Sequence, residues 1–162
     1  MIRLTIRTLD VDDEVEHRGI CMRIADVLRS KGDAVATVEP EITVAGLLAR
    51  LAEGNYGALP VVRDGELVGM VSERDVVRRL HADGPAVLER PVAEIMTTVV
   101  ATCVPDDGVA ALARVMTERR VRHLPVVVDG RLRGIVSIGD LVKARIDSLE
   151  VEREQLASYI AQ

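Results

Sequence analysis

The amino-acid sequence predicts a mixed α/β (α+β) fold made of two tandem β-α-β-β-α units, followed by a helical extension. The first observation is an internal repeat: residues 40–79 align without a gap on residues 105–144, and 17 of the 40 positions are identical. The second is the hydrophobic spacing, which alternates between strand-like runs and helix-like steps inside each copy. A repeat of this length is usually a supersecondary unit that cannot bury its apolar face alone. Two copies therefore predict two packed units with a seam between them.

Each copy opens with a strand and a helix. The β-rich runs at residues 34–38 and 99–104 each lead into a proline, which lacks an N–H and so ends a ladder of backbone hydrogen bonds. Apolar residues then recur at steps of three and four over residues 44–51 and 109–116, which is the spacing of an amphipathic helix.

Each copy closes with a hairpin and a second helix. The Asp-Gly pairs at residues 64–65 and 129–130 stand between apolar runs, and this dipeptide favours the tight turn of a β-hairpin. Ser72 and Ser137 follow the second strand of the hairpin, where we expect the next helix to begin. The order within each unit is therefore β-α-β-β-α.

Four segments follow from this layout. They are an N-terminal extension (1–21) expected to be poorly ordered, a first unit (22–84), a second unit (85–146) and a helical tail (147–162). In the tail region one stripe at steps of four and three carries apolar residues, with Arg153 in the remaining position: Val142, Ile146, Leu149, Leu156 and Ile160. This stripe has two interpretations, packing on its own domain or pairing with a partner chain.

Composition narrows the class of protein. The 162 residues suffice for one domain with a real core, and the net charge of −5 counts against nucleic acid as a partner. There is no Trp or Phe, so a pocket for a base would have aliphatic walls. No apolar run approaches the ~20 residues of a membrane span. Cys21 and Cys103 are isolated thiols, as a reducing compartment permits, and we expect a cytoplasmic protein.

The repeated motifs resemble a known family. Leu-Pro-Val-Val, Asp-Gly and Gly-x-Val-Ser-x-x-Asp occur in both copies at constant spacing, and the pattern covers roughly Met22 to Ile146. It is similar to the CBS domain pair, or Bateman module, here standing alone. The resemblance implies a disc of two units about a pseudo-two-fold axis, with two clefts between them. Many members bind adenine-containing ligands there, such as AMP, ADP, ATP, NAD or S-adenosyl compounds, and dimerise through their helices.

The doubled Ser-x-x-Asp supplies the ribose and phosphate candidates, Ser72 with Asp75 and Ser137 with Asp140. A helix N-terminus offers unpaired N–H groups to a phosphate, and a carboxylate can accept both hydroxyls of a ribose diol. In the family the Asp holds the ribose and the Ser contacts ribose or phosphate. The alternative is a capping box, in which Ser and Asp satisfy each other's backbone N–H groups.

The copies differ in charge ahead of Leu-Pro. The resemblance implies that basic residues at this place face phosphates, which makes Arg122 and His123 candidates for the cleft of Ser137 and Asp140. The first cleft has only Arg74 as a local cation. The alternative for the basic run is a solvated helix end, where cations offset the helix dipole.

Three small residues are candidates for the adenine pocket. Ala58 leaves room for an adenine edge, and Thr37 and Thr102 on the first strands are placed to face the base.

Signatures of catalysis are missing from the sequence, which has no phosphate loop, no dinucleotide fingerprint and no metal-ligand spacing. We expect a non-catalytic sensor, with an adenine nucleotide as regulatory ligand, no required cofactor, an unknown regulated protein and a homodimer through the unit helices and the C-terminal helix. One alternative is an interaction or dimerisation module with vestigial clefts. A weaker one is nucleic-acid contact through five arginines: Arg119, Arg120, Arg122, Arg131 and Arg133.

Overall fold

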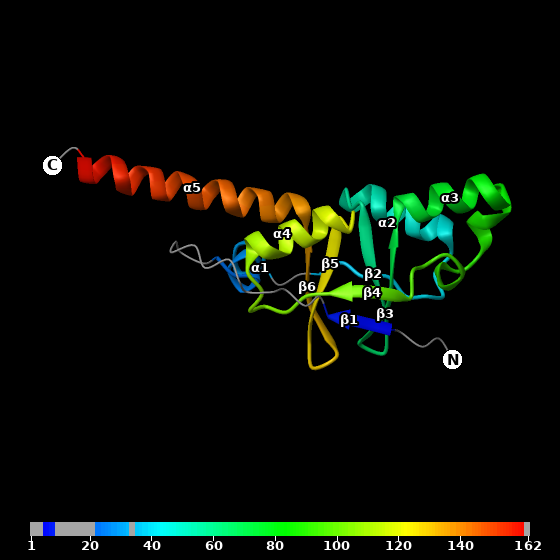
Figure 1. The fold of residues 1–162 in the computed structure, drawn as a ribbon. Helices are drawn as coiled ribbons and strands as arrows, with labels where there is room; N and C mark the ends of the chain where they lie inside the picture. Colours follow the sequence, from blue (N-terminus) through cyan, green and yellow to red (C-terminus); the bar gives the residue numbers. More distant parts are fainter. Residues whose placement is uncertain (1–4, 9–21, 33–34, 161–162) are drawn as a thin grey trace.

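The computed structural model describes residues 5–8, 22–32 and 35–160 (Figure 1). The elements in chain order are β1 (Thr5–Thr8), α1 (Ile24–Lys31), α2 (Val44–Gly54), β2 (Ala58–Arg63), β3 (Glu66–Ser72), α3 (Glu73–Asp83), the 3-10 helices η1 (Pro85–Glu89) and η2 (Val92–Glu94), β4 (Val99–Thr102), α4 (Val109–Glu118), β5 (His123–Val128), β6 (Arg131–Ser137) and α5 (Ile138–Ile160). The mixed α/β fold and the repeated order of its elements confirm the fold class.

Two equivalent hairpins form the centre of the molecule. β2 pairs antiparallel with β3 and β5 with β6, and the shared sheet has the order β2-β3-β6-β5. Asp64 and Gly65 turn with φ of 53° and 82°, and Asp129 and Gly130 with 51° and 76°. Positive φ at both turn residues is what a type I′ hairpin needs, which explains the repeated Asp-Gly pair.

The first strands of the two units differ. β4 is a full strand, and Cys103 beyond it forms a parallel bridge to Val126. Within residues 35–38, the described part of the other predicted run, only Val38 pairs, through a parallel bridge to Val61. Of the strand predicted at 34–38, the described residues 35–38 therefore form a single bridge.

A strand also forms within the segment expected to be a poorly ordered extension. Thr5–Thr8 runs parallel to β4 with Thr5 opposite Val99 and Thr8 opposite Thr102. Thr and Ile favour extended backbone, and the edge of β4 offers the hydrogen-bonding partners. The other residues of the 1–21 segment lie outside the described residues.

The lead-in segments are exchanged between the units. Ile24 and Val27 of α1 share a buried core with Leu124 and Leu141 of the second unit. In return, Val92 of η2 is buried in the core of the first unit. Each repeat therefore completes the core of the other, which ties the two units into one body.

Two glycines permit this exchange, because a side chain there would meet the lead-in segment. A Cβ on Gly134 in β6 would lie 2.5 Å from Leu28 Cδ2 of α1. A Cβ on Gly69 in β3 would lie 2.8 Å from Met96 Sδ and 3.0 Å from the carbonyl oxygen of Thr97. The shared Gly of the repeat motif is thus explained by packing.

The C-terminal tail continues the last helix of the second unit. α5 is a single helix of 23 residues, buried on one side by Leu141, Ala144 and Ser148. Beyond these it projects away from the body (Figure 1). The predicted helical extension is confirmed, and its apolar stripe is solvent-exposed: Ile146 is 51% exposed and Leu156 66%.

Candidate functional site

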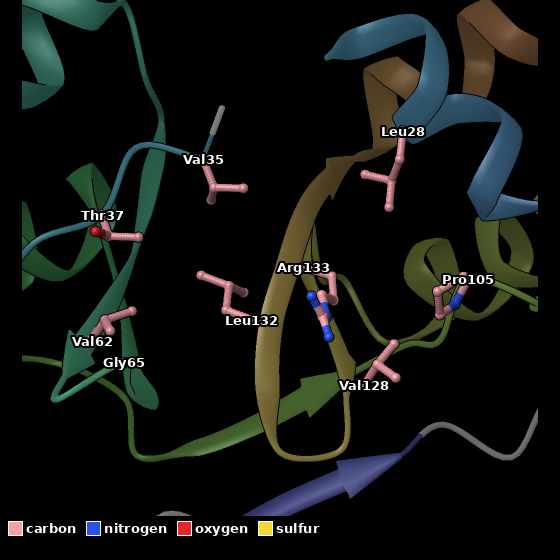
Figure 2. Close-up of a pocket in the computed structure, with 9 residues that line it drawn as sticks. All are labelled: Leu28, Val35, Thr37, Val62, Gly65, Pro105, Val128, Leu132 and Arg133. Carbon is pink, nitrogen blue, oxygen red and sulfur yellow. The ribbon is translucent and has the colours of Figure 1, made fainter. Parts of the chain in front are cut away.

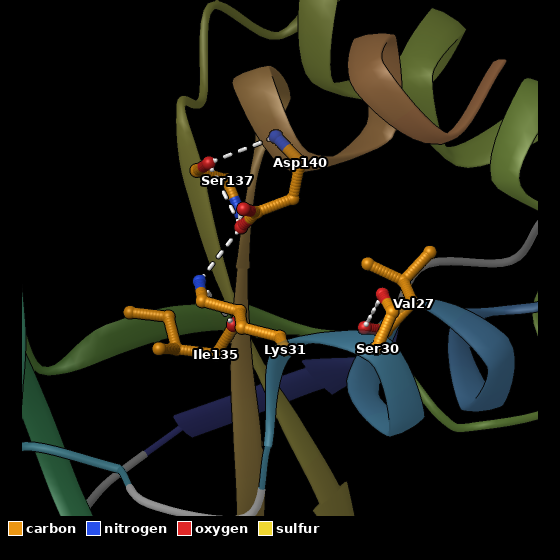
Figure 3. Close-up of polar contacts among 6 residues, drawn as sticks. All are labelled: Val27, Ser30, Lys31, Ile135, Ser137 and Asp140. Carbon is orange, nitrogen blue, oxygen red and sulfur yellow. Dashed lines mark hydrogen bonds and ion pairs between the residues drawn. The ribbon is translucent and has the colours of Figure 1, made fainter. Parts of the chain in front are cut away.

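The second Ser-x-x-Asp forms a compact polar cluster where β6 ends and α5 begins (Figure 3). The backbone N–H of Ser137 donates to Asp140 Oδ2 at 2.7 Å, and Ser137 Oγ donates to the same oxygen at 2.9 Å. Lys31, the last residue of α1, adds a third donor: its Nζ lies 2.7 Å from Asp140 Oδ2 and 3.2 Å from the carbonyl oxygen of Ile135.

The electrostatics of Asp140 follow from this geometry. Burial opposes ionisation of its carboxyl, but the hydrogen bonds from Lys31 and Ser137 outweigh that cost and hold the pKa of Asp140 below its ordinary value. Asp140 is therefore a preoriented carboxylate with a cation at its side.

The first Ser-x-x-Asp has the same local geometry without a cation. Ser72 N and Ser72 Oγ donate to Asp75 Oδ2 at 2.8 and 2.6 Å. Among the described residues no Lys or Arg pairs with Asp75. In both units the acid thus bonds back to the backbone N–H of its Ser, as a capping box requires. Each bond uses Oδ2, so Oδ1 makes no hydrogen bond within the described part of the chain.

His123 lies at the seam between the units. It begins β5 opposite Ser137, and its Cε1 lies 3.4 Å from where a Cβ of Gly57 in the first unit would stand. Burial lowers the pKa of His123, and the positive charges of Lys31 and Arg122 lower it further. The negative charges of Asp140 and Glu73 offset part of this effect. A neutral His123 at the seam is therefore the favoured form.

A cavity of about 820 Å³ opens between the two units (Figure 2). Its lining is aliphatic except for Thr37 and Arg133: Leu28, Val35, Thr37, Val62, Gly65, Pro105, Val128, Leu132 and Arg133. Leu28 belongs to α1, which ends at Lys31, and Arg133 belongs to β6, which ends at Ser137. The cavity is therefore lined by the two elements that lead to the Lys31–Asp140 pair, although neither Lys31 nor Asp140 is among its lining residues.

A second cavity of about 390 Å³ brings together cations that the sequence assigned to different clefts. Arg74 of the first unit and Arg122 of the second both line it, and Arg120 joins them. The remaining lining residues are Met116, Thr117, Val121 and Ile138.

Two adenine candidates lie away from these cavities. Ala58 is buried in β2 opposite Ser72, and Thr102 is 2% exposed at the end of β4, where β1 pairs with it. Neither is among the residues that line the two cavities. Lys31 and Arg133, by contrast, take positions in the site for which the sequence had no signal. Lys31 lies outside the aligned repeat, and its partner is 109 residues away.

Other chemistry is limited in the described part of the chain. No group of three His, Cys, Asp or Glu residues there could hold a metal ion. Nor is any helix among these residues long and apolar enough to cross a membrane. Cys103 is buried, and burial, with a smaller effect of the Asp107 charge, raises the pKa of its thiol to about 12. Such a thiol is a core residue rather than a nucleophile.

The molecule consists of two interlocked β-α-β-β-α units about a pseudo-two-fold axis. A polar cluster and two cavities lie at the seam between the units. The protein is therefore a tandem-repeat module with clefts between its repeats. The family model described as the CBS domain matches residues 24–82 and 92–147, so the chain belongs to the CBS domain family.

Relatives agree with this assignment. The CBS domain-containing protein CBSX3, mitochondrial, of Arabidopsis thaliana is 34% identical over 85% of this chain and 71% of its own. The structure of the CBS-domain containing protein ATU1752 from Agrobacterium tumefaciens has a TM-score of 0.74 at 38% identity, over 76% of this chain and 99% of that one. The CBS domain pair of protein MJ0100, solved in complex with 5-methylthioadenosine and S-adenosyl-L-methionine, has a TM-score of 0.68 at 27% identity, over 76% and 95%.

Proposed function

We propose that the protein is a non-catalytic regulatory module that binds an adenine-containing ligand in the cleft between Thr37 and Asp140. The observation that carries the proposal is the 820 Å³ cavity, which has aliphatic walls from both units and is lined by α1 and β6, the elements that lead to Lys31 and to the preoriented carboxylate of Asp140. The adenosine-derived ligands of MJ0100 support the choice of ligand class.

Each part of such a ligand has a matching group. The aliphatic walls at Val35 and Leu132 accept the faces of a purine, and the Thr37 hydroxyl offers one donor and one acceptor to its edge. The open Oδ1 of Asp140 can accept from a ribose hydroxyl while Oδ2 keeps its bonds. Lys31 provides a positive charge for an anionic group.

Regulation follows from the ligand's contact with both units. A ligand that touches the first unit at Thr37 and the second at Asp140 stabilises those arrangements of the units in which both contacts are made. It therefore shifts the population toward those arrangements. The size of the shift is set by how much more tightly the ligand binds these arrangements than the others. A partner protein that binds only one arrangement would therefore bind more or less of the protein when the ligand is present.

The test is isothermal titration with AMP, ATP, NAD and S-adenosylmethionine. At least one should bind below about millimolar, which corresponds to about −4 kcal/mol. Asp140→Asn should weaken that binding more than its matched control, Asp75→Asn, because the second cleft combines the cavity with the cation. The proposal fails if folded wild-type protein binds none of the four, and the choice of cleft fails if Asp75→Asn has the larger effect.

A second candidate function, interaction through α5, has its own observation. The exposed stripe includes Ile146, Leu149, Leu156 and Ile160, which cannot all reach the body of their own chain. An apolar stripe at steps of four and three is the seam that a helix presents to another helix. We propose a homodimer through this helix, and light scattering of the chain without residues 150–162 tests it. A dimer that survives the truncation contradicts it.

A further inference from the structure

The two clefts of the module differ in how far they are filled. Their residues correspond at the spacing of the repeat, so each wall of one cleft has a counterpart in the other. In the second cleft, three aliphatic residues stand around the open 820 Å³ cavity (Figure 2): Val35, Val62 and Leu132. In the first cleft, their counterparts are at most 8% exposed and pack into one hydrophobic cluster: Val100, Val127 and Leu67. The first cleft is therefore filled by the protein's own side chains.

The backbone also closes the first cleft. Met70 of β3 and Thr97, in the segment that leads into β4, exchange two hydrogen bonds of 3.0 and 2.8 Å. The matching residues of the second cleft are Ile135 and Gly32. There the connection is a side chain, because Lys31 Nζ donates to the carbonyl oxygen of Ile135 at 3.2 Å. Within the described residues, main chain thus closes one cleft and a lysine side chain bridges the other.

Side-chain identity does not explain this difference, since each of the three pairs consists of the same residue type. The two clefts differ in the backbone that carries the first valine. Val100 stands on β4, which pairs along its whole length with β1, residues 5–8 against 99–102 (Figure 1). The described residues 35–38, which carry Val35, form only a single bridge. A paired strand is extended and directs alternate side chains to one face, so β1 holds Val100 in the cleft.

We infer that β1 is an autoinhibitory strand, which keeps the first cleft closed and leaves the chain with one open binding cleft and one latent one. Ser72 and Asp75 of the latent cleft have the same hydrogen-bond geometry as Ser137 and Asp140. The latent cleft would therefore take the same class of adenine-containing ligand, and this part of the inference rests on the proposed function. The closing role of β1 does not depend on it.

The position of β1 allows its release. The strand has four residues and a single neighbouring strand, β4. A short edge strand has few interactions to lose when it separates, so its opening free energy lies at the low end of the range within a folded protein. A ligand that binds the opened first cleft shifts the population toward chains with a released β1. The pairing of β1 therefore sets the ligand concentration at which a second equivalent binds.

Cysteine labelling tests the closure without any ligand. Val35→Cys and Val100→Cys place thiols of similar size at matching positions. N-ethylmaleimide should modify Val35→Cys about tenfold faster than Val100→Cys, because a buried thiol reacts only when its surroundings open. Tandem mass spectrometry assigns the label to position 100 and not to the buried Cys103.

The decisive variant is Ile6→Pro/Arg7→Pro. Successive N–H groups of a strand point to opposite sides, so one of the two prolines removes a donor to β4. The variant should accelerate the labelling of Val100→Cys several-fold and leave that of Val35→Cys unchanged. Deletion of residues 1–8 should have the same effect, and the control Ile6→Val/Arg7→Lys should have none. Equal labelling of the two cysteines without a change in β1, or an unchanged rate for Val100→Cys in both β1 variants, overturns the inference.

Stoichiometry tests the latent cleft as a ligand site. Calorimetric titration with AMP, ATP, NAD and S-adenosylmethionine should give one equivalent per wild-type chain for any of the four that binds. The double-proline variant should gain a second equivalent, and Asp75→Asn in that variant should remove it. Two equivalents in wild type overturn the inference, and a single one in the double-proline variant overturns the latent site. If none of the four binds while the labelling follows β1, the proposed function fails and the closure by β1 stands.

Discussion

Lys31 Nζ lies 2.7 Å from Asp140 Oδ2 and connects the end of α1 to the start of α5. The same oxygen accepts both hydrogen bonds from Ser137, so one carboxylate oxygen has three donors. Asp75 of the first unit has the two serine bonds and no lysine. The two repeats therefore share the frame of the site and differ in its charge.

Removal of the lysine should alter ligand preference. In Lys31→Met, Asp140 keeps its Ser137 bonds and the open Oδ1 that accepts from the ribose, so we expect adenosine to bind about as tightly as to wild type. Any change in adenosine affinity should stay within about fivefold, because a partly exposed ion pair contributes roughly 0–1 kcal/mol. The ratio of AMP to adenosine affinity should fall, because the charge that attracts phosphate is lost. Calorimetric titration with both ligands measures these changes.

The control for this variant is Arg29→Met, which removes an exposed cation two residues earlier on α1. It should leave both affinities unchanged. An unchanged ratio of AMP to adenosine affinity in Lys31→Met would contradict the assignment of Lys31 to the anionic group of the ligand.

The local features of the fold could be predicted from sequence, and the contacts between units could not. Asp-Gly turns and helix periodicity depend on residues close in the chain, so both hairpins were evident. The exchange of α1 into the core of the second unit depends on contacts such as Ile24 with Leu124, for which no local pattern exists.

The same reasoning applies to the site. Ser137 and Asp140 are three residues apart, so their motif can be recognised in the sequence. The sequence predicts separate clefts for Arg74 and Arg122, because each lies in its own repeat, whereas packing brings both to one cavity. Asn55 and Arg120 occupy matching positions and both have positive φ. That the second unit has an arginine in this left-handed conformation can be seen only from the backbone angles.

His123 should make stability depend on pH near neutrality. Because folding lowers its pKa from the ordinary 6.5, the unfolded chain binds the proton more tightly, and acidification through pH 6.5 favours unfolding. Wild type should therefore lose more unfolding free energy between pH 8 and pH 5.5 than His123→Asn does. Urea denaturation at the two pH values measures the difference.

The titration of Asp140 does not contribute to the pH dependence of stability between pH 8 and pH 5.5. Its lowered pKa stabilises the fold above the ordinary value of 3.8, and that contribution is lost only as the pH falls below 3.8. An equal pH dependence in wild type and His123→Asn would show that His123 is not buried at the seam.

The two motif glycines should differ in their tolerance of alanine. At Gly69 the new Cβ meets the Thr97 carbonyl, which is fixed by its hydrogen bond from Met70 N at 3.0 Å. We expect Gly69→Ala to cost about 1–3 kcal/mol, as overpacking of a core does. At Gly134 the new Cβ meets mainly the end of the Leu28 side chain, which can move, so the cost should be smaller.

Urea denaturation of both variants, with Leu28→Ala and the Leu28→Ala/Gly134→Ala double variant, tests this explanation. The double variant should lose less than the sum of its single losses, because truncation of Leu28 removes the clash. Additive losses would mean that Leu28 is not the residue that restricts Gly134.

The charges beside the stripe of α5 predict how two copies of the helix pair. Lys143 and Glu150 lie on one flank of the stripe, one heptad apart, and Arg145 and Glu152 lie on the other. If Ile146 of one copy packs against Leu149 of an antiparallel second copy, each flank brings a basic residue opposite an acidic one. A parallel pair in register would instead place the two Arg153 side chains side by side. We therefore expect the antiparallel dimer.

The pair of Lys143 and Glu150 distinguishes the two orientations. In the antiparallel dimer each single reversal, Lys143→Glu or Glu150→Lys, should weaken association several-fold, since it converts two attractive pairs into repulsive ones. The double reversal should restore it. In a parallel dimer Glu150 meets Arg145 of the second copy and Lys143 meets no acid, so Lys143→Glu would have little effect and could not rescue Glu150→Lys. Sedimentation equilibrium of the four proteins over a range of concentrations measures the association constants, and the second pattern would contradict the antiparallel assignment.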